Sequence, residues 1–397
     1  MSERSDALPY WRLSSFYFLY FACLGVMTPY WSLYLEDAGF DAPAIGVVLA
    51  VIAGTRIVAP NFWGWVADRS GRRLSIIRGG AAMAALCFAP LLLEDALAWV
   101  VICIALHTFF WGAILAQYEV ITLASMGSEV QRYGQVRLWG SISFVLLVVL
   151  GGEIFDRAGV RHFPMVMLIP LLLLAVGSFS IRDVASSQQQ LLAGSMRAAL
   201  RSPAVWSFLG ASFLLQFSHA PYYGFFSLLL ARAGYSSVGI GYLWALGVVA
   251  EVLLFALAHH LFRRFSLRQV LVASLLLAAL RWLMIGFGAA SVGVLVLAQC
   301  LHAATFGSFH AASMEFVRRH FGHAGQGQGQ ALYSAVSFGA GGALGALGSG
   351  WLWDRSQHLV FGIAALAALL GAVLLLCGLS GPPVERSAAA AAPGGAR

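Results

Sequence analysis

The stretch Gly64-Trp65-Val66-Ala67-Asp68-Arg69-Ser70-Gly71-Arg72-Arg73 lies between two apolar runs of helical length, at about 43–67 and 74–93. A short charged loop between two such runs is typical of a hairpin that joins two membrane helices on the cytoplasmic side. Gly64 would let a neighbouring helix approach closely, and Gly71 would permit a tight turn. Asp68 would pair with nearby arginines or face the N-terminus of another helix. Arginines alone fit any positively charged loop, but they do not account for the two glycines and the aspartate at this spacing.

The composition is that of a polytopic membrane protein. Of 397 residues, 60% are hydrophobic and only 10% are charged, whereas soluble domains carry about 25% charged residues. The net charge of +7 comes from arginines grouped in alternate loops, so it does not indicate a nucleic-acid partner. The five cysteines lie in apolar runs without metal-ligand spacing. With no nucleophile constellation either, we expect neither an enzyme nor a metal or other cofactor.

Apolar runs of spanning length, about 20 residues, occur twelve times. The first is long and has no small-residue cleavage site, so we expect it to be retained as a helix. The predicted spans lie at about 12–35, 43–67, 74–93, 96–125, 135–155, 162–181, 203–232, 237–262, 267–289, 291–317, 327–352 and 357–379. The sequence thus predicts an all-α membrane protein with two six-helix halves, 1–181 and 203–380, a cytoplasmic linker at 182–202 and a disordered tail at 381–397.

Arginine placement predicts the orientation. Eighteen of the 24 arginines fall on one side of the predicted membrane and four on the other, which leaves Arg56 and Arg281 inside spans. Arg137 begins a span and can belong to the loop or to the interior. Because cytoplasmic loops are enriched in basic residues, we expect both termini and the linker in the cytoplasm.

The two halves repeat each other. Leu106-His107 with Gly112 recurs as Leu301-His302 with Gly307, a shift of 195 residues. The same shift relates Arg56 to Glu251, one cation and one anion at matching depths. Parallel six-span repeats place the substrate site at the repeat interface near the midplane. We therefore expect these two charges to face a shared cavity.

The opening motif, with its fixed glycine, aspartate and arginines, resembles the loop between helices 2 and 3 of the major facilitator superfamily of transporters. This resemblance implies alternating access and gives the motif residues a role in conformational change. The residues carried over are Gly64, Asp68, Arg69, Gly71, Arg72 and Arg73.

The stretch Tyr133-Gly134-Gln135-Val136-Arg137-Leu138-Trp139-Gly140 is similar to the start of helix 5 in the lactose permease group. The resemblance implies that Glu119 and Arg137 bind substrate. It further implies that Glu251, Arg281 and His302 couple transport to protons. Lactose permeases carry a carboxylate one turn after the helix 10 histidine, where this chain has Thr305. Glu251 and His302 are therefore the residues to consider as proton carriers.

A fuller likeness, over nearly the whole chain, is to the bacterial 3-phenylpropionate permease group. It rests on His219 to Phe225, on Gly241 to Glu251, and on short stretches around Trp31 and Tyr333. It implies proton symport of a small aromatic carboxylic acid, whose carboxylate an arginine holds and whose ring aromatic side chains stack upon. The expected substrate-binding residues are Trp31, Arg56, Tyr118, Glu119, Arg137, His219, Tyr222, Tyr223 and Trp244.

Other interpretations stay open at this point. Arg56 can instead be a structural partner of an acidic residue, and Glu119 with Arg137 can be a gate or structural pair. His107 and His310 fit packing roles, and each aromatic can face lipid. Proton-coupled sugar or nucleoside symport is an alternative function. Drug antiport is disfavoured because no proline occurs between Arg137 and Phe155, and a sensor would usually need an added soluble domain. We expect a monomer in the bacterial inner membrane, with the lipid bilayer, a small-molecule substrate and protons as partners.

Overall fold

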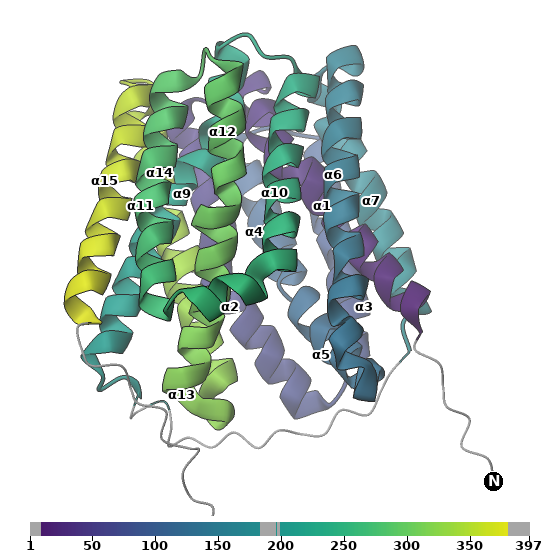
Figure 1. Ribbon diagram of the computed structural model, residues 1–397. Coiled ribbons are helices and arrows are strands. Elements are labelled where there is room, and N and C mark those ends of the chain that lie inside the picture. Colours follow the sequence, from purple (N-terminus) through teal and green to yellow (C-terminus); the bar gives the residue numbers. More distant parts are fainter. Residues whose placement is uncertain (1–8, 183–195, 197–198, 380–397) are drawn as a thin grey trace, which may run out of the picture.

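The computed structural model describes residues 9–182, 196 and 199–379, and the helices of this part of the chain form one upright bundle (Figure 1). The predicted tail at 381–397 and most of the predicted linker at 182–202 lie outside the described residues. We call α1–α7 the first half and α9–α15 the second half. The first half comprises α1 Tyr10–Asp37, α2 Ala42–Ser70, α3 Arg73–Phe88, α4 Leu97–Trp111, α5 Leu115–Met126, α6 Tyr133–Ala158 and α7 Phe163–Gly177. The second comprises α9 Pro203–Arg232, α10 Ser237–Arg264, α11 Leu267–Gly288, α12 Val292–His302, α13 Ser308–Ser334, α14 Gly342–Trp353 and α15 Gln357–Gly378.

Among the described residues, eleven helical segments are long and apolar enough to cross a membrane. The remaining predicted span, at 203–232, is the 30-residue helix α9, whose limits are the same as predicted. It is not among the eleven, and it carries buried polar side chains at Gln216, Ser218 and His219. An all-α polytopic fold is confirmed.

Three predicted spans are less regular than expected. The span at 96–125 is broken near Gly112 into α4 and α5. The last third of the chain contains two π-helical segments, η5 at Ala303–Gly307 and η6 at Ala335–Gly341. Between them α13 turns back at Gly322, whose φ of 65° suits glycine. Single π turns inside helices are frequent at functional sites, and η5 follows His302 directly.

The two halves touch chiefly through two helix pairs. Within the first half α1 packs on α6 and α7, and within the second α15 packs on α9 and α11. Across the halves α2 packs on α14 and α6 packs on α10. These cross-half pairs flank the space in which the site described below lies.

The glycine-rich run at 339–350 packs closely against α9. A Cβ at Gly341 would lie 2.5 Å from the carbonyl oxygen of Phe213, and one at Gly345 would lie 2.5 Å from that of Phe217. Both carbonyls belong to α9. The glycines therefore let η6 and α14 approach the backbone of α9.

A methyl group at Gly345 should destabilise the protein. Gly345→Ala would push α14 away from α9, at a cost of about 1–3 kcal/mol, the range for overpacking a tight contact. Gly362→Ala in α15 is the matched control, because a Cβ there would have no atom within 4 Å. We expect a lower thermal unfolding midpoint in detergent for Gly345→Ala only. Equal midpoints for the two variants would contradict the packing described.

Candidate functional site

A cavity of about 1090 Å³ lies between the two halves. Its wall comes chiefly from α1, α2, α4 and α6 on one side and from α9, α10 and the η5–α13 segment on the other. Four charged side chains line it, namely Arg56, Glu119, Arg137 and Glu251. Charged groups inside a membrane bundle normally face a cavity or a partner, and these four share one cavity.

One end of the bundle is sealed by contacts between the halves. The Asp156 carboxylate, near the end of α6, accepts hydrogen bonds from the backbone N–H groups of Ser237 (2.7 Å) and Val238 (3.3 Å). These N–H groups open α10, so the carboxylate also faces the positive end of the helix dipole. The junction ties α6 to α10 across the halves.

A second junction at the same end involves Arg232, at the end of α9. Its guanidinium lies 2.9 Å from the Glu36 carboxylate of the first half and 3.6 Å from the Asp354 carboxylate of the second. Gly152 and Gly241 also allow close approach here, since a Cβ on either would meet backbone atoms of the other half within 3.0 Å. We call this the sealed end.

The cavity runs toward the other end, where α5 ends and α13 turns back at the bottom of Figure 1. The lining of α6 starts at its first residue, Tyr133, and that of α10 continues to Ala256. In the described part of the chain, the ion pairs at this end join residues of the same half. We call this the open end.

The charges on the first-half wall stay apart. The Arg137 guanidinium lies 3.9 Å from the ring centre of Phe21. Glu119 accepts a hydrogen bond of 3.4 Å from the Tyr133 hydroxyl. Among the described residues no ion pair within 4.0 Å includes Arg56, Glu119 or Arg137. A structural Glu119–Arg137 pair is thus not formed in this conformation, and both arginines can take an anionic partner.

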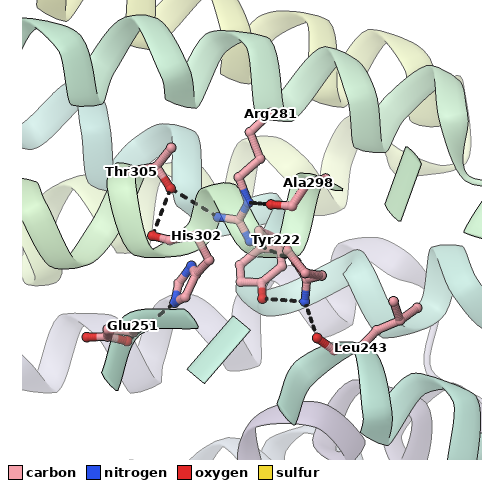
Figure 2. Close-up of polar contacts among 8 residues, drawn as sticks. Tyr222, Leu243, Glu251, Arg281, Ala298, His302 and Thr305 are labelled. Atoms are coloured by element: carbon pink, nitrogen blue, oxygen red, sulfur yellow. Dashed lines mark hydrogen bonds and ion pairs between the residues drawn. The ribbon is translucent and has the colours of Figure 1, made fainter. Parts of the chain in front are cut away.

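On the second-half wall Glu251 and His302 lie together. The His302 Nε2 atom is 3.7 Å from a Glu251 carboxylate oxygen, as Figure 2 shows. The exposed fractions of the two side chains are 7% for His302 and 19% for Glu251. The Nδ1 atom of His302 is buried without a hydrogen-bond partner among the described residues. The two groups are thus close enough for the protonation of one to affect that of the other.

Arg281 lies behind this wall and is fully buried. Its guanidinium donates to the Ala298 carbonyl oxygen (2.9 Å) and to the Gln299 side-chain oxygen (3.0 Å), and it packs 4.1 Å from the ring centre of Tyr222 (Figure 2). No carboxylate of the described residues lies within 4.0 Å of it. Arg281 is therefore a fixed cation held by neutral oxygens.

Gln299 organises this buried network and was missed by sequence reasoning. Its amide nitrogen donates to the Tyr222 hydroxyl (3.1 Å) and to the Leu243 carbonyl oxygen (2.7 Å), while its oxygen accepts from Arg281. One side chain thereby joins α9, α10, α11 and α12. The available signal was a polar amide within the apolar run at 291–317.

Aromatic side chains supply much of the remaining wall. Trp31, Tyr222, Tyr223 and Trp244 all line the cavity, as predicted for ring-stacking residues. The ring centres of Tyr223 and Trp244 lie 6.3 Å apart in a stacked arrangement. Phe306 lines the wall nearby. A flat apolar group entering the cavity would meet faces from both halves.

Three predicted site residues do not reach the cavity. Tyr118 is fully buried and donates its hydroxyl to the Leu13 carbonyl oxygen (2.8 Å), so it joins α5 to α1. His219 is fully buried and its Nδ1 contacts the Leu215 carbonyl oxygen at 2.9 Å. The third is Arg281. These residues support the wall, whereas His310, expected to be a packing residue, lines the cavity.

The motif between α2 and α3 forms a compact charged turn. Arg73 pairs with Asp68 and also donates to the Gln117 side chain. Gly71 ends α2 with a φ of 65°, a conformation that favours glycine. The close helix approach expected at Gly64 is wrong for this conformation, because a Cβ there would meet no atom within 4 Å. None of the described helices packs against Gly64 at the open end. Of the other motif arginines, Arg69 lies 5.7 Å from the ring centre of Trp65, and Arg72 precedes α3.

Comparisons with known proteins agree with this architecture. Residues 10–363 match the MFS_1 like family. The chain is 35% identical to the "Probable 3-phenylpropionic acid transporter" of Escherichia coli (strain K12), over 89% of this chain and 93% of that one. It is 26% identical to the "Maltose permease" of Geobacillus stearothermophilus, over 91% and 93%. The crystal structure of the nucleoside transporter NupG superposes with a TM-score of 0.81, at 17% identity, over 94% of this chain and 99% of that one.

The buried network yields a prediction for Gln299→Leu. This change leaves the Arg281 guanidinium and the Leu243 carbonyl each short of a partner, and unpaired buried polar groups cost about 1–3 kcal/mol each. We expect a lower thermal unfolding midpoint in detergent than for the wild type. Cys300→Ala is the control, since the adjacent Cys300 is exposed. An unchanged midpoint for Gln299→Leu would contradict the role assigned to the amide.

Proposed function

Since this chain belongs to the MFS_1 like family of membrane transporters, we propose that it takes up a small aromatic carboxylic acid, such as 3-phenylpropionate, together with protons. It would act by alternating access, with the two halves moving about the central cavity. The likeness at 35% identity to a probable 3-phenylpropionic acid transporter supports this substrate class.

One observation carries the proposal. Two arginines, Arg56 and Arg137, line the cavity without an ion-pair partner among the described residues. A guanidinium matches a carboxylate through two parallel N–H···O bonds. A substrate carboxylate would supply the anion that these groups lack. The opposite wall offers Tyr223, Trp244 and Phe306 to the substrate ring.

Proton coupling is assigned to Glu251 and His302. Their contact at 3.7 Å places a carboxyl and an imidazole where one proton can reside on either. The carboxyl also lines the cavity, so the proton has a route to water at the open end. In this assignment Arg281 is a fixed cation that holds Tyr222 and the η5 region in place.

The orientation follows from the arginines. The open end carries the Asp68–Arg73 turn and the basic residues that end α10, and the positive-inside rule supports a cytoplasmic location for it. The structure would then be an inward-facing state. Both termini would be cytoplasmic in a bacterial inner membrane, and the sealed end would face outward.

The proposal predicts proton-driven uptake by purified protein in vesicles. Labelled 3-phenylpropionate should accumulate when the vesicle interior is more alkaline than the outside, and should not accumulate without the gradient. Uptake of labelled nucleosides and of labelled maltose is measured in the same way, because a relative and a fold neighbour are named for those substrates. Accumulation of a nucleoside or sugar in place of the acid would contradict the substrate proposed.

Arg137 should contribute mainly to affinity for the carboxylate. Arg137→Gln removes a charged hydrogen-bond donor, and such bonds contribute about 1.5–3 kcal/mol, so KM for 3-phenylpropionate should rise roughly tenfold or more. The matched control is Arg157→Gln, which changes an exposed arginine at the other end of α6. Equal KM values for the two variants would show that Arg137 does not hold the substrate.

A further inference from the structure

The cavity holds equal numbers of positive and negative charges. Its charged lining residues are two arginines, Arg56 and Arg137, and two carboxylates, Glu119 and Glu251, which sum to zero when the histidines are neutral. None of the four forms an ion pair with another within 4.0 Å. The four charges are therefore separated from one another, and each side chain borders the cavity in this open conformation.

Closing the open end would exclude water from the cavity. A charge without water or a partner is costly in a membrane interior, so the closed cavity favours zero net charge. Arg281 does not enter this balance, because it is already fully buried and keeps the same neutral partners within its own half. Compared with Arg281, the four charged groups on the cavity wall are the ones that would lose contact with the cavity when the open end closes.

A bound monocarboxylate upsets the balance by one negative charge. We propose that one proton on Glu251 accompanies each substrate carboxylate, so that transport of a monocarboxylate is electroneutral. This inference rests on the proposed function. The proton adds to a carboxylate oxygen of Glu251 and leaves from it on the other side of the membrane, with no other bond made or broken.

Glu251 is the exchangeable carboxylate because of its surroundings. Glu119 keeps a phenol donor, Tyr133, and lies on the same half as both arginines. Among the described residues Glu251 forms an ion pair within 4.0 Å only with His302. The two arginines that share the cavity with it, Arg56 and Arg137, both lie in the other half. Gly307 packs beneath Glu251, where a Cβ would lie 3.2 Å from the Glu251 Cγ atom. The distance between Glu251 and these arginines therefore depends on whether the open end is closed.

This assignment makes Arg137 a shared counter-ion. In the empty carrier, ionised Glu251 balances the cavity and allows closure. In the loaded carrier, the substrate carboxylate takes that place and Glu251 must be protonated. A loaded carrier without the proton, or an empty carrier with it, carries one unbalanced charge and should close poorly.

The direct test measures charge and proton movement by the wild-type protein in proteoliposomes. For 3-phenylpropionate we expect one proton per substrate, no transport current, and an uptake rate that does not depend on membrane potential. A substrate-driven current or a ratio other than one would overturn the charge balance while leaving symport intact. Absence of any uptake of the acid would instead overturn the proposed function and this inference with it.

Glu251→Gln separates the steps of the cycle. The glutamine mimics the protonated carboxyl, so the loaded carrier stays balanced and exchange of labelled for unlabelled 3-phenylpropionate should persist. The empty carrier keeps an excess positive charge, so net accumulation should fall by roughly a hundredfold. Glu153→Gln is the control, because that carboxyl pairs with Arg157 on the outside of α6.

Two results with Glu251→Gln would overturn the assignment. Wild-type accumulation would show that another group carries the proton. Loss of both exchange and net accumulation would show that Glu251 binds the substrate itself. The wild-type proton ratio remains decisive if the variant does not fold.

Discussion

A charged side chain inside a membrane must keep either water or a partner, and this constraint governs the structure of the bundle. Arg281 satisfies it with neutral oxygens in a dry wall. Arg56, Arg137, Glu119 and Glu251 satisfy it with a cavity. The bundle is thus divided into a packed network that stays fixed within one half and a set of charges whose hydration depends on how the halves sit.

The sealed end shows how the same physics joins the halves reversibly. Asp156 and Arg232 cross between them through a helix-end contact and an ion pair at positions open to solvent. Exposed ion pairs contribute little, about 0–1 kcal/mol, so such a junction can open without a large barrier. Glycines at the same end allow the backbones to approach without interlocking side chains. Weak polar contacts and smooth surfaces are what a moving interface requires.

Much of this arrangement was predictable from the sequence, because hydropathy reports burial from water over about 20 residues. The limits of α9 match the predicted span. The internal repeat likewise predicted that Arg56 and Glu251 face one cavity, and both line it. Hydropathy does not report which way a helix face turns. Arg56 and Arg281 are both single arginines in apolar runs, so both were expected to take part in transport directly. In the structure Arg56 lines the cavity, whereas Arg281 lies behind its wall.

Other features of the structure were not predicted from the sequence, for related physical reasons. The π-helical turns η5 and η6 arise from tertiary packing, so local sequence preference did not reveal them. Gln299 gains its role from partners on three other helices. The expected contact at Gly64 requires a neighbour at the open end, where this conformation has separated the halves. A sequence encodes all conformations of the cycle, whereas one structure shows a single conformation.

The central claim is that the unpaired arginines of the cavity receive the substrate. A structure of the protein with 3-phenylpropionate bound tests it most directly. The account predicts that the ligand carboxylate lies about 3 Å from guanidinium nitrogens of Arg56 or Arg137, with its ring against Tyr223 and Trp244. A ligand seated elsewhere, or one whose carboxylate contacts neither arginine, would contradict it.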